Sequence, residues 1–297
     1  MSHSKFSVWI KAARLRAFPL ALSCVALGGF LAAERNEIDW TVLSLAVITT
    51  ILLQLLSNLA NDLGDSVHGA DHIHRRGPTR TVQSGLISRR SMKTAVILIS
   101  ILSFASGILL ILVSVESWRD GMVFLGLGIV AILAAIGYTM GKRPYGYYGL
   151  GDLSVFIFFG WVGVVGTYYL QTHSFDPILL LPASACSFFA VAVLNVNNIR
   201  DIESDRQAGK FTFAARLGHD GARKYHLILL CAGILSAALY TWISGGQWLF
   251  LLALPLVAFN GWNTYKRTEV GALDPLVRQM AMTSLIFVSL FGIGIVI

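Results

Sequence analysis

Charged residues are scarce in this sequence, and their scarcity excludes most classes of soluble protein. Asp, Glu, Lys and Arg make up 13% of the 297 residues, whereas 55% are hydrophobic and the mean hydropathy is +0.68. A soluble globular domain carries roughly 25% charged residues. The chain has no low-complexity tract and no shortage of apolar residues, so intrinsic disorder is excluded. The composition predicts an all-α polytopic membrane protein.

Cysteine is rare as well. The three cysteines, Cys24, Cys186 and Cys231, all lie inside apolar runs, where free Cys behaves as a small hydrophobic residue. A disulfide framework is therefore excluded. The net charge of +7 would suggest nucleic acid in a soluble protein, but in a membrane protein Lys and Arg collect on the cytoplasmic side. We expect a lipid bilayer as the surroundings, with no nucleic acid and no obligate protein partner.

Apolar runs long enough to cross a bilayer, which takes about 20 residues each, predict nine transmembrane helices. They span residues 18–33, 40–60, 92–115, 122–140, 153–170, 178–195, 225–243, 248–262 and 280–297. The first, sixth and eighth runs are short or contain proline. The residues before the first run carry scattered Lys and Arg and no cleavage-site pattern, which indicates an amphipathic segment on the membrane surface rather than a signal peptide.

Lys and Arg are distributed unequally between the two sides of these runs. Of the 23 Lys and Arg residues, all but Arg35 and Arg119 fall in segments that share a side with the N-terminus. The positive-inside rule then places the N-terminus in the cytoplasm and the C-terminus outside. No organellar transit peptide is evident, so we expect the cytoplasmic membrane of a cell, with these loops facing the cytoplasm.

One membrane-embedded domain is expected over residues 1–297. Its two long loops follow the second and sixth apolar runs, and each opens with Asn and acidic residues. This four-run offset predicts pseudo-repeat halves at 17–140 and 153–262 and a ninth helix at 280–297. Long loops in compact proteins commonly carry function.

Two acidic clusters open these loops. The clusters consist of Asn61, Asp62, Asp65 and Asp71, and of Asn198, Asp201 and Asp205. Asp62 and Asp65 are spaced i, i+3, and the second pair is spaced i, i+4, so each pair would share one helix face. Converging carboxylates repel one another unless a cation lies between them. Because Mg²⁺ prefers oxygen ligands and bridges carboxylates to substrate phosphates, we expect Mg²⁺ to hold a diphosphate here.

Basic residues accompany both clusters. They are Arg75, Arg76 and Arg80 after the first, Lys142 and Arg143 in the middle loop, and Arg200, Arg206 and Lys210 near the second. Guanidinium and ammonium groups bind phosphate oxygens, although positive-inside bias alone would also place any one of them on this side. Arg80 and Lys210 lie nearest to the clusters and are the stronger candidates.

Small and aromatic residues form two further patterns. Gly160, Gly163 and Gly166 would allow close approach between helices. Tyr145 and Tyr147 belong to a dense aromatic set that packing or a membrane-interface belt explains for the most part. One of these two rings is a candidate for shielding an allylic cation.

The paired aspartates resemble the two aspartate-rich motifs of the UbiA superfamily of intramembrane prenyltransferases. The resemblance rests on Asn61-Asp62-x-x-Asp65 and Asp201-x-x-x-Asp205, and the nine expected spans in a four-plus-four-plus-one layout match that fold. In many members the third Asp of the first motif follows the second by four residues, whereas Asp71 follows Asp65 by six. The later arginine, matched by Arg80, is displaced by two as well, so an inserted pair of residues explains both differences.

Four stretches have a narrower resemblance, to the 1,4-dihydroxy-2-naphthoate polyprenyltransferases of menaquinone biosynthesis. They are residues 57–62 running on through 76–85, then 143–152, 166–171 and 195–201. The resemblance implies that a polyprenyl diphosphate loses its diphosphate to leave an allylic cation. The ring of 1,4-dihydroxy-2-naphthoate then attacks that cation at the carbon bearing the carboxylate, and loss of CO₂ with oxidation gives demethylmenaquinone.

The same resemblance assigns roles to the candidate residues. The metal ligands would be Asp62, Asp65, Asp201 and Asp205, joined by Asp71 and assisted by Asn61 and Asn198. Arg76, Arg80 and Lys210 would balance the diphosphate charge, with Tyr145 in contact with substrate. The acceptor carboxylate also needs a cationic partner, and Lys142 or Arg143, which lie close to the tyrosine-rich loop, are our candidates for it. An anionic, soluble ring substrate is expected to enter from a basic cytoplasmic face.

Two alternatives stay open. Another aromatic acceptor, such as 4-hydroxybenzoate or homogentisate, needs the same chemistry, and composition does not separate these acceptors. A transporter would share the internal repeat, but it would place ionisable groups near the bilayer centre. Here the acidic clusters lie at the cytoplasmic ends of the runs, which disfavours transport.

Overall fold

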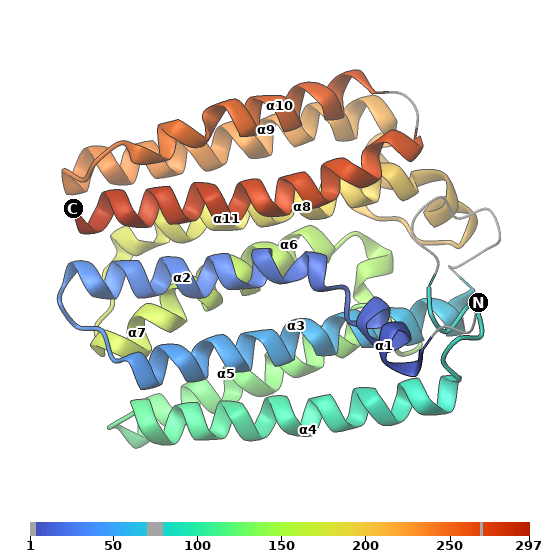
Figure 1. Ribbon diagram of the computed structural model, residues 1–297, viewed down its shortest axis with the longest axis horizontal. Coiled ribbons are helices and arrows are strands. Elements are labelled where there is room, and N and C mark those ends of the chain that lie inside the picture. Colours follow the sequence, from blue (N-terminus) through green and yellow to red (C-terminus); the bar gives the residue numbers. More distant parts are fainter. Residues whose placement is uncertain (1–3, 70–79, 268–269) are drawn as a thin grey trace.

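The computed structural model describes residues 4–69, 80–267 and 270–297, and in these residues it contains helices and no strand. Its long helices lie side by side along one direction (Figure 1). They are α2 (Phe18–Glu34), α3 (Trp40–His68), α4 (Arg89–Ser114), α5 (Trp118–Gly137), α8 (Leu180–Gln207), α9 (Phe213–Ser244), α10 (Leu254–Lys266) and α11 (Asp274–Val296). A short helix, α1 (Lys5–Ala13), precedes them. The N-terminus and the C-terminus lie at opposite ends of the bundle (Figure 1).

The fifth expected span is a composite helix. It consists of α6 (Gly151–Val155), a π-helical stretch (Phe156–Val165) and α7 (Gly166–Thr172). Short 3₁₀ turns occupy Leu15–Ala17, Tyr145–Tyr148, Pro177–Leu179, Leu249–Ala253 and Val270–Leu273. A π-helical stretch of ten residues is rare, and such stretches occur frequently at functional sites. The apolar periodicity of the sequence did not reveal it.

Each of the nine expected apolar runs overlaps a helical segment in the described part of the chain. Eight of these segments are long and apolar enough to cross a membrane. The run at 248–262 is divided instead between the 3₁₀ turn Leu249–Ala253 and α10. The chain is therefore an all-helical protein with eight or nine candidate spans.

Helices α3 and α8 continue beyond their apolar runs, and this extension decides where the acidic clusters lie. Asp39 caps the start of α3, because its carboxylate accepts hydrogen bonds from the backbone N–H groups of Thr41 (2.7 Å) and Val42 (3.1 Å). These bonds favour the charged form and lower the pKa of Asp39. At the other end Gly69 adopts a left-handed conformation (φ 70°) and ends the helix. Asp62 and Asp65 thus lie in the final turns of α3, as the i, i+3 spacing predicted.

Two apolar cores hold the bundle together. The larger packs α2, α8, α9 and α11 around fully buried aromatic side chains such as Phe189, Phe287 and Phe291. The smaller joins α1 to α3 and α4, with Val8 and Ala12 buried against Leu56 and Met92. By contrast, α5 contains no buried residue, so its apolar side chains are available to lipid and to the cavity described below.

Gly160 lets the π-helical stretch pack directly against α8. A Cβ at this position would collide with the Ser187 side chain and lie 2.6 Å from the carbonyl oxygen of Ala183. Gly163 meets Cys24 of α2 in the same way, with the Cys24 Sγ at 2.8 Å. A Cβ on Gly166, by contrast, would lie 3.8 Å from its nearest neighbour, a carbon of the Phe124 ring. Two of the three predicted small-residue contacts are therefore confirmed.

Replacing Gly160 by Ala is expected to destabilise the protein by about 1–3 kcal/mol, the usual cost of forcing extra volume into a packed core. Gly166→Ala is the matched control, because its new methyl group has room, and it should leave the melting temperature nearly unchanged. Thermal unfolding of the detergent-purified variants measures both. Equal stability of the two variants would mean that the close contact between Gly160 and α8 is absent in solution.

Candidate active site

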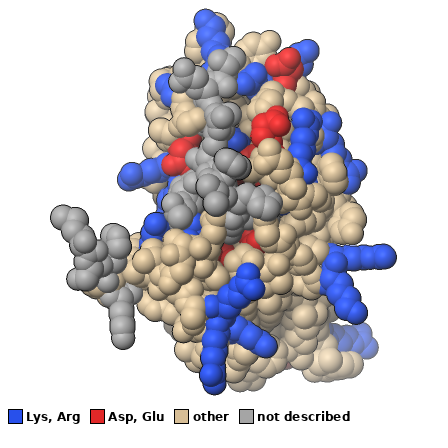
Figure 2. Space-filling view, turned by 90° about the vertical axis from the view of Figure 1, so that its right-hand side faces the viewer, with Lys and Arg blue, Asp and Glu red and all other residues tan. Residues whose placement is uncertain are grey.

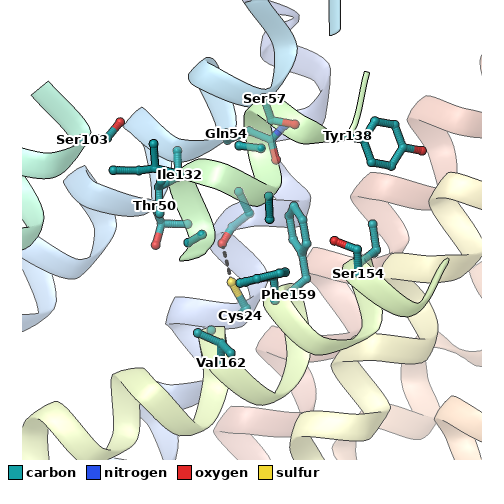
Figure 3. Close-up of a pocket in the computed structure, with 18 of the residues that line it drawn as sticks. Cys24, Thr50, Gln54, Ser57, Ser103, Ile132, Tyr138, Ser154, Phe159 and Val162 are labelled. Atoms are coloured by element: carbon teal, nitrogen blue, oxygen red, sulfur yellow. Dashed lines mark hydrogen bonds between the residues drawn. The ribbon is translucent and has the colours of Figure 1, made fainter. Parts of the chain in front are cut away.

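A cavity of about 410 Å³ lies inside the bundle. Apolar side chains from α2, α4, α5 and the π-helical stretch line most of its length, among them Phe104, Phe124 and Phe158. Figure 3 shows Phe159 and Val162 on one side of it and Thr50, Gln54 and Ser57 of α3 on another. The charged and Asn side chains that line it gather at one end of the cavity and are Arg14, Arg16, Asn58, Asn61, Asp65, Arg80, Asn197, Asn198 and Lys210. The cavity therefore joins an apolar chamber to a charged end.

The first acidic cluster is held by the segment that follows the undescribed residues 70–79. Asp62 accepts hydrogen bonds from the Thr81 hydroxyl (2.7 Å) and from the backbone N–H groups of Thr81 (3.1 Å) and Val82 (3.3 Å). Asp65 accepts one from the Arg80 guanidinium (2.7 Å). The side chains of Asp62, Asp65 and Arg80 are all buried. Buried charges persist only when they are paired or hydrogen-bonded, and this segment supplies such partners to both carboxylates.

Gly64 lies between the two aspartates, and because it has no side chain it lets the end of α5 approach α3 closely. A Cβ there would lie 2.6 Å from the Thr139 carbonyl oxygen. This approach lets the Thr139 hydroxyl donate to the backbone oxygen of Ala60 and to Oδ1 of Asn61, at 3.1 Å each. The end of α5 is thereby fixed against the first cluster.

The second acidic cluster carries its own cations. The Arg200 guanidinium binds both oxygens of Asp201, at 2.9 and 2.7 Å, and its other nitrogen reaches Asp274 of α11 at 2.6 Å. The Lys210 ammonium lies 3.4 Å from Oδ1 of Asp205. The second oxygen of Asp205 is buried and has no hydrogen-bond partner among the described residues. Such an unsatisfied buried oxygen is open to a further cation.

Lys210 and Tyr147 connect the two clusters. Burial by itself lowers the pKa of Lys210, but the carboxylates of Asp205 and Asp65 more than offset this, so its pKa lies above the ordinary value and the ammonium stays charged. The Lys210 Nζ lies 5.7 Å from the centre of the Tyr147 ring, and the Tyr147 hydroxyl donates to Asp65 (3.1 Å). A backbone bond from Phe211 to Tyr147 (2.9 Å) fixes this arrangement.

Two further tyrosines line the cavity beside the clusters. The Tyr145 hydroxyl donates to the backbone oxygen of Ala134 (2.8 Å) and lies 2.9 Å from Oγ of Ser154. Its ring meets that of Tyr138 edge-on, with centroids 5.4 Å apart. Burial raises the pKa of Tyr145, so this phenol is neutral at physiological pH.

The structure brings together some of the predicted site residues and separates others. Six of them line the cavity: Asn61, Asp65, Arg80, Tyr145, Asn198 and Lys210. Asp62 lines a smaller adjoining pocket. Asp201 and Asp205 line neither space and pair with Arg200 and Lys210. Lys142 and Arg143 are exposed and line neither space. Asp71 and Arg76 lie outside the described residues, and within the described part no three His, Cys, Asp or Glu side chains are grouped closely enough to hold a metal by themselves.

Sequence reasoning missed several residues that the fold brings to the charged end. Arg14 and Arg16 come from the N-terminal segment, which the sequence predicted to lie on the membrane surface. Asn58 could have been found from the sequence, because it lies four residues before Asp62 and hence on the same face of the helix. Tyr138 and Thr139 follow α5 and carried no motif. Viewed from this end, the molecule shows many Lys and Arg side chains around its edge and few Asp and Glu (Figure 2).

Fold and site together define an all-helical membrane protein in which two buried Asn- and Asp-containing clusters face each other at one end of an apolar cavity. Residues 21–290 match the model of the UbiA prenyltransferase family, and the chain belongs to that family.

Individual relatives agree with this assignment. The chain is 46% identical over 302 residues to the 1,4-dihydroxy-2-naphthoate octaprenyltransferase of Haemophilus influenzae, covering 100% of this chain and 98% of that protein. Among solved structures, it resembles the apo form of a UbiA homologue from Aeropyrum pernix K1 with a TM-score of 0.68 at 18% identity, covering 95% of this chain and 98% of that one. It also resembles a UbiA homologue from Archaeoglobus fulgidus bound to DMAPP and Mg²⁺, with a TM-score of 0.57 at 16% identity, covering 96% and 99%. The two structural matches show a shared fold.

Proposed function

We propose that this protein transfers a polyprenyl group from a polyprenyl diphosphate to 1,4-dihydroxy-2-naphthoate, with loss of the ring carboxylate as CO₂. The observation that carries the proposal is the cavity, which joins an apolar chamber to a buried cluster of carboxylates and cations. A diphosphate with a long hydrocarbon tail has the same two parts. The full-length identity of 46% to a protein named for this reaction supports the naphthoate as the acceptor.

The donor set fits a divalent metal of the Mg²⁺ type. All candidate ligands are oxygens, and one Asp205 oxygen is buried without a partner among the described residues. Mg²⁺ is commonly held by one or two carboxylates, with waters and substrate phosphate oxygens completing the shell. The protein ligands would be Asp62, Asp65, Asp201 and Asp205, with Asn61 and Asn198 assisting and Asp71 joining from the undescribed segment. When bound, the metal stabilises negative charge on the departing diphosphate.

The protein's own residues would perform the remaining tasks. Arg80 and Lys210, together with Arg76, would bind diphosphate oxygens and offset their charge as the bond to the allylic carbon breaks. Apolar side chains along the cavity would hold the prenyl tail and exclude water from the cation. The Tyr145 ring lies near the charged end, where its face could stabilise that cation. Attack by the ring carbon that bears the carboxylate, followed by loss of CO₂, leaves demethylmenaquinol, which a later oxidation converts to demethylmenaquinone.

Nine spans, with the N-terminus in the cytoplasm and the C-terminus outside, are our proposal for the topology. It is supported by the termini lying at opposite ends of the bundle (Figure 1) and by the concentration of Lys and Arg at the N-terminal end. The active site would then face the cytoplasm from the cytoplasmic membrane. The pseudo-repeat of residues 17–140 and 153–262 within one domain is likewise proposed, because the two clusters occupy equivalent ends of α3 and α8.

A direct assay tests the reaction. Detergent-purified protein is incubated with Mg²⁺, octaprenyl diphosphate and carboxyl-labelled 1,4-dihydroxy-2-naphthoate, and we expect labelled CO₂ together with a prenylated naphthoquinone or its quinol. Both should disappear when EDTA removes the metal. Release of diphosphate without CO₂ would retain prenyl transfer but point to another acceptor, such as 4-hydroxybenzoate or homogentisate. Folded protein that consumes neither substrate would contradict the proposal.

A further inference from the structure

The N-terminal segment, α1 and the 3₁₀ turn Leu15–Ala17, is docked onto the site rather than loosely attached. Val8 and Ala12 are buried against α3 and α4. The Asn58 side chain of α3 donates a hydrogen bond to the backbone oxygen of Ala13 at 2.8 Å. Arg14 then adopts a left-handed conformation (φ 50°), which ends α1 and turns the chain toward α2. This turn brings Arg14 and Arg16 to the same side, where both line the cavity.

Between this segment and the first acidic cluster lies the smaller pocket that Asp62 lines, which we name the vestibule, of about 300 Å³. The charged residues that line it are Lys11, Arg14, Arg16, Arg80, Arg200 and Asp62. Five cations therefore surround one carboxylate. Arg14, Arg16 and Arg80 also line the main cavity, so the vestibule adjoins the charged end of the chamber. Lys11 and Leu15 are exposed, so the other side of the vestibule reaches solvent.

The cations of the vestibule are not equivalent. Arg80 binds Asp65 at 2.7 Å and Arg200 binds Asp201 at 2.7 Å, so both belong to the acidic clusters. Arg16 instead reaches Asp274 at 3.4 Å, outside both clusters. That carboxylate is 38% exposed and also pairs with Arg200 at 2.6 Å, so it keeps a cation when Arg16 leaves. A long, partly exposed ion pair contributes little. Arg16 can therefore exchange Asp274 for another carboxylate at low cost.

We propose that the vestibule binds the carboxylate of the aromatic acceptor and that Arg14 and Arg16 are the residues that hold it. The inference rests on the proposed function, because it assigns the acceptor subsite of that reaction. A guanidinium binds a carboxylate with two parallel hydrogen bonds, and Ile10 and Leu15 supply apolar contact for the rings. The diphosphate is placed at the clusters, beside Arg80 and Lys210. An acceptor in the vestibule would lie next to that charged end, where the allylic carbon would be.

This assignment can be tested by ligand binding alone, by comparing a ligand that carries the carboxylate with one that lacks it, in the wild type and in variants. Binding of 1-hydroxy-2-naphthoate and of 1-naphthol, which lacks the carboxylate, is measured by isothermal titration to the detergent-purified protein. The wild type is expected to prefer the carboxylate ligand by about 10- to 100-fold, the usual effect of a hydrogen bond to a charged group. Arg14→Gln or Arg16→Gln should remove most of this preference while leaving 1-naphthol binding unchanged. Arg119→Gln, which removes an exposed arginine from the first turn of α5, is the control and should retain the preference. Arg143 is the rival candidate for the carboxylate, so loss of the preference in Arg143→Gln would overturn the assignment.

Steady-state kinetics supply a second measurement. The Arg variants should raise KM for 1,4-dihydroxy-2-naphthoate by about 10-fold or more and leave KM for the polyprenyl diphosphate unchanged. Asn58→Ala keeps both arginines but removes the hydrogen bond that holds the N-terminal segment at Ala13. It should therefore weaken the carboxylate preference, and it provides the test if either Arg variant fails to fold. An unchanged preference in the folded variants, or a loss of diphosphate affinity instead, would overturn the assignment. Because the binding comparison needs no turnover, its result is distinct from a failure of the proposed reaction.

Discussion

Asp62→Asn is expected to lower turnover by about 10²–10³-fold, the range seen when one group that stabilises transition-state charge is removed. The substitution keeps the shape of the side chain. The single carbonyl oxygen of Asn can still accept the hydrogen bonds from Thr81, but the bond from the Val82 N–H (3.3 Å) to the other oxygen is lost, so a loss of stability of about 1–3 kcal/mol is expected. The negative charge, however, is lost from the proposed metal ligands. Turnover as a function of Mg²⁺ concentration measures the effect, and half-maximal activity should require more Mg²⁺ than in the wild type.

Asp220→Asn is the matched control for this prediction. The Asp220 side chain is 92% exposed and pairs only with Arg223, three residues further along α9. Its loss should leave both turnover and the Mg²⁺ requirement unchanged, since exposed pairs contribute little. A folded Asp62→Asn variant with the wild-type rate and Mg²⁺ requirement would remove Asp62 from the proposed ligand set.

Lys210→Met should both destabilise the protein and abolish most activity. The side chains of Lys210 and Asp205 are only 12% and 7% exposed. Removing one partner of a buried ion pair costs about 3–5 kcal/mol, because the other charge is left uncompensated. Here Asp205 would lose its cation, and Asp65 would lose a neighbouring positive charge. The melting temperature and the rate of prenyl transfer are the two quantities to measure.

A double variant tests the structural effect of Lys210. Lys210→Met combined with Asp205→Asn removes the uncompensated carboxylate, so much of the lost stability should return. Its activity stays low in any case, because Asp205 is itself a proposed metal ligand. Lys142→Met is the control, because Lys142 is exposed and lines neither the cavity nor the vestibule. A Lys142→Met variant that loses activity while Lys210→Met retains it would reverse the proposed roles of these two lysines.

The positions of the two acidic clusters were predictable because they depend on local patterns. The apolar runs predicted helices that overlap those observed, and the i, i+3 and i, i+4 spacings predicted one-sided carboxylate pairs near the ends of α3 and α8. Lys210, which the sequence places near the second cluster, lies 3.4 Å from Oδ1 of Asp205. These inferences needed only residues within one short stretch of the chain, about 20 positions for an apolar run.

Contacts between segments distant in sequence were not predictable in this way. Tyr147 reaches Asp65 across 82 positions, and Arg200 reaches Asp274 across 74. The π-helical stretch lies within a uniformly apolar run, so no change in composition marked it. Lys142 and Arg143 were expected to bind the acceptor carboxylate. The structure does not support this role, because both side chains are exposed in the turn that carries them.

The sequence by itself determined that the chain is a helical membrane protein with two Asn- and Asp-containing motifs at the ends of apolar runs. Hydrophobicity, charge bias and spacing are properties of short stretches of chain, so no folded structure is needed to detect them. Only the tertiary structure decided that Arg14 and Arg16 join the charged end of the cavity and that Lys210 lies close to both Asp205 and Asp65. Those placements depend on which helices pack together and how closely, as Gly64 against Thr139 and Asn58 against the N-terminal segment illustrate.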